Sequence, residues 1–70
     1  MNTYIIPFSI DNDVWIETVR AKSLLEAQDR LMNRLSNDWE LDVPADWEDF
    51  LAILDNNGFR VGELKDVEEF

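Results

Sequence analysis

The sequence predicts a small α+β domain that spans residues 1–70, with the element order β-β-α-α-β. We expect a three-stranded sheet, built from a β-hairpin and a C-terminal strand, with two helices on one face. Three observations predict it: alternating apolar residues at the start, two segments with apolar residues three or four apart, and a short β-branched segment after them. Each of these elements has one apolar face to bury, so a single layer shared by helices and sheet is expected.

The first strand is predicted over residues 3–10, where side chains alternate between two faces. One face carries the apolar residues Tyr4, Ile6, Phe8 and Ile10. Pro7 has no N–H group to donate to a neighbouring strand. The strand should therefore lie at a sheet edge, or Pro7 should be turned outward.

The turn Asp11-Asn12-Asp13 predicts a hairpin, with the returning strand over residues 14–21. A three-residue loop would place Phe8 opposite Ile16. This register puts apolar side chains together on one face, so it is predicted in preference to a two-residue loop.

Ser23 and Glu26 form a capping box, because each side chain can accept from the backbone N–H of the other residue. A helix should follow, to about Ser36. Its apolar stripe consists of Leu24, Ala27, Leu31 and Leu35, widened by Met32.

A loop is expected over residues 37–45, after which Asp46 is the predicted N-cap of a second helix. This helix should run from Trp47 to about Asn56, and Asn57-Gly58 should end it. Its apolar face is predicted to consist of Trp47, Phe50, Leu51 and Leu54.

Residues 59–61 predict a short third strand, and Gly62 indicates a bulge at its end. The tail, residues 63–70, has apolar residues three apart. That spacing fits either a strand end or a last helical turn, and the sequence leaves both open.

Size and composition limit how the domain is stabilised and where it works. The chain has 70 residues, no Cys and no His, so disulfides are excluded and zinc loses its two commonest ligands. Tight packing or self-association remains, and a homodimer is one expectation. No signal peptide and no membrane span is read, so we expect a cytoplasmic protein, in the host cell if a phage encodes it.

The charge is strongly negative and unevenly distributed. Sixteen acids and six bases give a net charge of -10. Residues 1–37 have a net charge of -1, whereas residues 38–70 have -9. Direct binding to nucleic acid or to an anionic membrane is disfavoured, because phosphate contacts need clustered Lys and Arg. A basic partner is favoured, and the alternative is that the charge serves only solubility.

Catalytic and metal-binding motifs are not found, so no catalytic, cofactor or metal residue is predicted. The serines have no His to activate them, and the neighbours Glu48 and Asp49 diverge on a helix instead of converging. The calcium-loop beginnings at Asp11 and Asp55 both lack the ligand at position five.

The segment from residue 38 to residue 49 is the candidate partner-binding site, because it combines carboxylates with aromatic residues. Carboxylates on a rigid surface can imitate the phosphates of a duplex, and aromatic residues can anchor an interface. The alternatives are that the acids are a solvated helix face and that Trp39 packs over the first helix as a continuation of Leu35. The predicted site consists of Asp38, Trp39, Glu40, Asp42, Asp46, Glu48 and Asp49.

Residues 21–27, Ala-Lys-Ser-Leu-Leu-Glu-Ala, follow a predicted strand and open a predicted helix. This arrangement resembles the A-x-S-x-x-E-A opening of many small proteins from phages and mobile elements. In size, acidity and lack of Cys the chain is also similar to small phage inhibitors of host proteins, among them anti-restriction, anti-CRISPR and DNA-mimic proteins.

The sequence therefore leads to two expectations of function. The first is a non-enzymatic protein that presents an acidic surface to a basic partner, such as a host protein that binds nucleic acid. The alternative is a small structural or assembly module that associates with itself.

Overall fold

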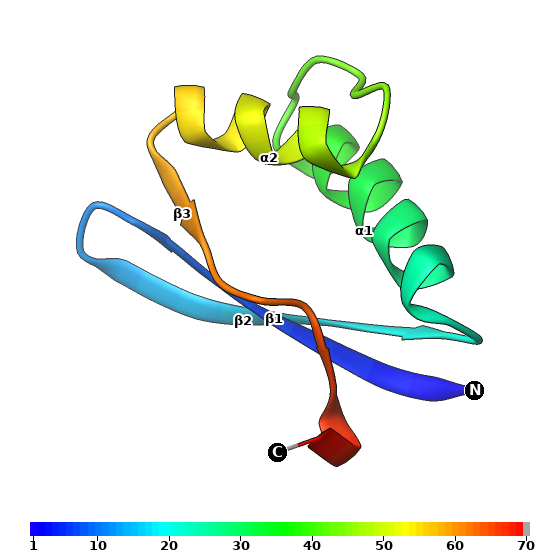
Figure 1. Ribbon diagram of the computed structural model, residues 1–70. Coiled ribbons are helices and arrows are strands. Elements are labelled where there is room, and N and C mark those ends of the chain that lie inside the picture. The colour runs from blue at the N-terminus through cyan, green and yellow to red at the C-terminus, as the bar shows by residue number, and fades with distance from the viewer. Residues whose placement is uncertain (70) are drawn as a thin grey trace.

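The computed structural model describes residues 1–69 and confirms the α+β class, with the order β-β-α-α-β-β (Figure 1). Both helices lie on the same side of one antiparallel sheet. The elements are β1 (Asn2–Ile10), β2 (Asp13–Ala21), α1 (Leu24–Asp38), α2 (Trp47–Asn56), β3 (Phe59–Val61), β4 (Lys65–Asp66) and the 3-10 turn η1 (Val67–Glu69).

The sheet has β1 at its centre. β2 pairs with one side of β1, and β3 and β4 pair with the other side, so β2 is an edge strand. The prediction of three strands missed β4, which is only two residues long. The tail contains both alternatives that the sequence left open, a short strand followed by a 3-10 turn. Phe70 lies outside the described residues.

The predicted hairpin register is wrong by one residue. The turn contains only Asp11 and Asn12, so Phe8 lies opposite Trp15 instead of Ile16. Asp11 has a φ of 53°, a left-handed conformation that Asp tolerates in tight turns. A slip of one residue exchanges the two faces of the returning strand.

The observed register places Trp15 under the helices, where its ring stacks on Phe8 with centroids 6.0 Å apart. Its indole N–H donates to Oε2 of Glu17 over 2.7 Å. The same register leaves Val14 77% and Ile16 59% exposed on the open side of the sheet. Trp buries more apolar surface than Val or Ile, which accounts for the register that places Trp15 on the helical face.

Pro7 lies on the central strand and not on an edge strand, but its side chain is turned outward and exposed, which is the second predicted alternative. It is tolerated because the neighbouring ladder is interrupted there: β3 ends at Val61, and β4 begins only at Lys65. Gly62 lies beside Pro7 in this gap and donates its backbone N–H to the Pro7 carbonyl over 2.9 Å. A Cβ on Gly62 would lie 2.3 Å from Cγ of Pro7, so this position requires glycine.

Both helices begin at the predicted caps. Ser23 accepts from the backbone N–H of Glu26, and α1 continues to Asp38, two residues further than predicted. α2 has the predicted bounds, and Gly58 follows its end with a φ of 87°. The apolar core between helices and sheet consists of Tyr4, Ile6, Phe8, Val19, Ala21, Ala27, Leu31, Leu35, Phe50 and Leu54.

Candidate functional site

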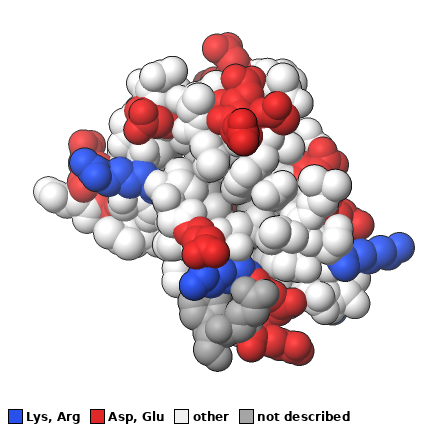
Figure 2. Space-filling view, viewed as in Figure 1, with Lys and Arg blue, Asp and Glu red and all other residues white. Residues whose placement is uncertain are grey.

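The predicted site lies where α1 ends, the chain crosses to α2, and α2 begins. Figure 2 shows carboxylates gathered at the top of the view, where Figure 1 places α2 and the connection before it, with no Lys or Arg among them. All six acids of the predicted site are exposed: Asp38, Glu40, Asp42, Asp46, Glu48 and Asp49.

The connection between the helices begins with a tight reversal. Trp39 donates its backbone N–H to the Leu35 carbonyl over 2.9 Å, and Leu41 donates to the Ser36 carbonyl over 2.9 Å. Glu40 lies between them with a φ of 53°, a conformation that is uncommon for a residue other than Gly, Asn or Asp. These bonds hold the carboxylates of this turn on an ordered backbone.

Two of the six acids also stabilise the start of α2. Asp46 accepts from the backbone N–H of Asp49 over 2.8 Å, and Asp49 accepts from the backbone N–H of Ala45 over 2.8 Å. The bond to Asp46 satisfies an N–H group of the first helical turn, and the bond to Asp49 ties the residue before the cap to the helix. The negative charges also interact favourably with the helix dipole.

Trp39 does not stand out from the surface as an anchor. It is half-buried, and its ring stacks on Phe59 with centroids 4.8 Å apart and an interplanar angle of 15°. It also contacts Phe8 edge-on at 5.5 Å and Trp15 at 5.9 Å. The structure therefore places Trp39 in an aromatic cluster that joins β1, β2 and β3, where it packs against the core.

An open groove of about 580 Å³ lies between α1 and the first turn of α2. Its apolar lining includes Leu25, Met32 and Trp47, and its acids are Asp29, Asp46 and Glu48. The predicted site therefore extends onto α1 through Leu25 and Asp29, two residues that sequence reasoning missed. One feature of the sequence could have indicated this extension: Leu25 is apolar but lies outside the predicted apolar stripe of its helix.

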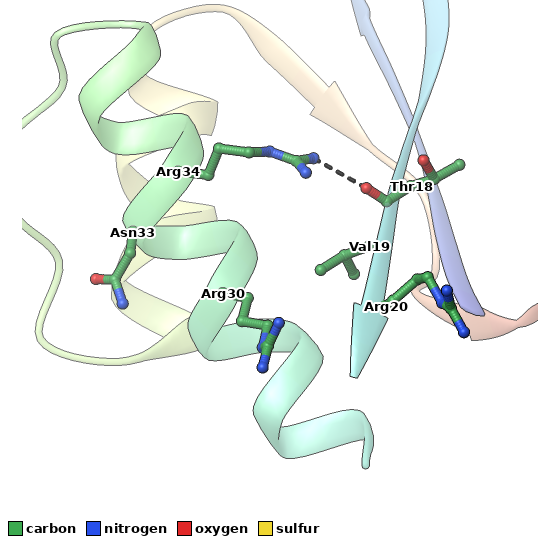
Figure 3. Close-up of a pocket in the computed structure, with 6 residues that line it drawn as sticks. All are labelled: Thr18, Val19, Arg20, Arg30, Asn33 and Arg34. Carbon is green, nitrogen blue, oxygen red and sulfur yellow. Dashed lines mark hydrogen bonds between the residues drawn. The ribbon is translucent and has the colours of Figure 1, made fainter. Parts of the chain in front are cut away.

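A second pocket, between α1 and the edge strand β2, is lined by arginines (Figure 3). Arg34 reaches across it and donates to the Thr18 carbonyl over 3.1 Å and to Glu17 over 3.2 Å. Arg20 points away from α1 in the same view, and Arg30 is paired with Glu26 at 2.9 Å. These cations do not converge on one point, so the pocket is not a built anion site.

The remaining geometry offers little for other chemistries. Within residues 1–69, no group of three or more Asp or Glu side chains is close enough to hold a metal ion. Neither helix in the same range has the length and apolar character needed to cross a bilayer. The Ser23 hydroxyl caps α1, because it accepts a hydrogen bond from the backbone N–H of Glu26.

Compared with protein-family models, with curated proteins and with solved structures, the chain has no match.

Proposed function

We propose that this protein is a non-enzymatic binding protein that presents the surface formed by residues 38–49 to a basic protein partner. The observation that carries this proposal is that the six carboxylates of this surface are exposed and form no ion pair within the part of the chain that the structure describes. No Lys or Arg occurs between Arg34 and Arg60.

Ion pairing supports the same conclusion. The ion pairs found in the described part of the chain join Arg30 to Glu26, Arg34 to Glu17 and Lys65 to Glu63. All three lie outside residues 38–49. Unpaired carboxylates of one sign create a negative potential that steers a basic partner and speeds its association.

The rigidity of the surface favours recognition over simple solubility. The turn bonds around Glu40 fix the backbone that carries the acids, and so do the bonds from Asp49 to Asp46 and from Ala45 to Asp49. Charges held in fixed positions lose less entropy on binding than charges on a flexible chain.

The partner class we favour is a host protein that binds nucleic acid, because such proteins carry clustered Lys and Arg for phosphate contacts. A carboxylate surface that occupies those cations would act as a DNA mimic and inhibit the partner. Among the small phage inhibitors that the chain resembles in size and acidity, the DNA-mimic proteins act in this way.

The test is a triple charge reversal, Glu40→Lys with Asp42→Lys and Glu48→Lys, whose matched control is Asp13→Lys with Asp55→Lys and Glu68→Lys. Both sets change the net charge equally at exposed positions. Glu17 and Glu26 are unsuitable controls, since both are in ion pairs.

Wild type and control should capture the same basic protein from a bacterial lysate, and the site reversal should lose it. The captured complex should dissociate with rising salt and with added duplex DNA, because both compete for the partner's cations. Retention of the partner by the site reversal, with an unchanged circular dichroism spectrum, would refute the proposal.

One observation favours self-association as a second candidate function. The open face of the sheet carries exposed Val14 and Ile16, and the outward positions of β1 and β2 carry no acid: Thr3, Ile5, Pro7, Ser9, Val14, Ile16, Thr18 and Arg20. Two copies of a molecule with a charge of -10 repel least across such a face.

Sedimentation equilibrium tests this candidate. Wild type should sediment with the mass of two chains and Ile16→Lys with the mass of one, whereas Leu25→Lys, on the helical side, should behave as wild type. A monomeric wild type at high micromolar concentration would rule out the candidate.

A further inference from the structure

The groove between α1 and α2 combines apolar side chains with carboxylates. Its lining includes the apolar side chains of Leu25, Met32 and Trp47. Leu25 is 76% exposed, although it lies only two residues from the fully buried Ala27. A large apolar side chain left in water beside a hollow is typical of a docking site.

Met32 and Trp47 give the groove one adaptable wall and one rigid wall. Met32 is half-buried at the edge of the core and has an unbranched side chain, which adapts its shape to an incoming group. Trp47 is half-buried against Phe50, with ring centroids 5.4 Å apart. Its ring is therefore held in position and offers a rigid wall.

The charges around the groove are all of one sign. Asp29 comes from α1, whereas Asp46 and Glu48 come from the start of α2, and no Lys or Arg lines the groove. The two nearest cations along α1 are engaged elsewhere: Arg30 pairs with Glu26, and Arg34 with Glu17. A lysine or arginine beside an inserted side chain would meet carboxylates on both helices.

From this complementarity we infer that the groove receives one bulky apolar side chain from a partner segment in which Lys or Arg flanks that residue. The inference rests on the proposed function, because it names where and how the acidic surface contacts its partner. The carboxylates orient the basic segment, and the apolar insertion supplies the buried centre that holds it.

The two methionines provide a direct measurement. In protein labelled with ¹³C at the methionine methyl groups, Met32 reports on the groove and on the neighbouring hollow beside Leu41 and Val43, which the variants below tell apart. Met1, at the start of the chain, serves as the internal control. The probe is a short synthetic peptide with one phenylalanine between lysines, whose ring current shifts the resonance of any methyl group that it contacts.

We expect this peptide to shift the Met32 signal and leave the Met1 signal in place. The same peptide with Gly in place of Phe should not shift Met32, and neither should the version with Glu in place of Lys. An equal shift with the Glu peptide would overturn the charge requirement. A Lys–Phe peptide that leaves Met32 unmoved would overturn the groove as the docking site.

A matched pair of variants separates the groove from the rest of the helix. Leu25→Gln removes a side chain that lines the groove, whereas Leu24→Gln makes the same change at the adjacent residue, which does not line it. Leu25→Gln should weaken peptide binding about tenfold, and Leu24→Gln should leave it unchanged. Equal affinities for the two variants would refute the inference.

The outcomes distinguish this inference from the proposed function. If Leu25→Gln binds as wild type while the triple charge reversal loses the partner, the acidic surface stands and the groove is excluded. If the triple reversal binds both the lysate partner and the Lys–Phe peptide as wild type does, the acidic surface itself is wrong, whatever Met32 reports.

Discussion

Neighbouring residues of β2 show how differently the two faces of the sheet are used. Trp15 lies under the helices against Phe8, Trp39 and Phe59. Ile16, the next residue, points to the opposite face of the sheet and is 59% exposed. Both residues are apolar and both favour strands, so composition alone does not assign them to a face. Contacts with Trp39 and Phe59, which lie far along the chain, place Trp15 on the covered face.

The strongest test of this comparison removes each side chain in turn. Trp15→Ala should lower the free energy of unfolding by about 3 kcal/mol, since it deletes the centre of the aromatic cluster. Ile16→Ala should change it by no more than about 0.5 kcal/mol, as expected for an exposed position. Chemical denaturation measures both. A larger loss for Ile16→Ala would support the three-residue loop and contradict the observed register.

A smaller effect is expected at the gap in the ladder beside Pro7. Gly62→Ala should destabilise the fold by about 1–3 kcal/mol, because the added Cβ has no room beside the Pro7 ring. In a double-mutant cycle, Pro7→Ala should recover part of this loss, since it removes the ring atoms that the Cβ meets. Strictly additive losses would mean that the two residues do not interact in this way.

The smallest effect concerns the helical layer that covers one face. Ser23→Ala removes the acceptor for the Glu26 N–H and should cost about 0.5–2 kcal/mol. Ser23→Asp keeps an acceptor at the same position and should restore the stability. An unchanged denaturation midpoint for Ser23→Ala would show that the cap contributes nothing to the covering layer.

The elements that the sequence predicted well are those set by residues close together in the chain. α2 has its predicted bounds because Asp46 caps it and Gly58 ends it, within twelve residues of each other. The hairpin register depends instead on Trp15 meeting Trp39 and Phe59, far along the chain. β4 is too short to produce an alternation that could be detected.

In the candidate site, too, some features follow from neighbouring residues and others depend on contacts between distant segments. The exposure of Glu40, Asp42 and Glu48 follows from their charge, and the sequence predicted it. The burial of Trp39 in the aromatic cluster depends on the position of β3. The groove depends on how α1 and α2 lie against each other, which brings Leu25 and Asp29 next to Trp47. No local pattern encodes that arrangement.

The bond from Arg34 to the Thr18 carbonyl has a consequence for polymerisation. Thr18 belongs to an edge strand, and unpaired backbone groups on such a strand are a template for adding strands from other molecules. Arg34→Met would keep the stem of the side chain and free the carbonyl, so fibrils should grow from β2 in concentrated solutions of that variant.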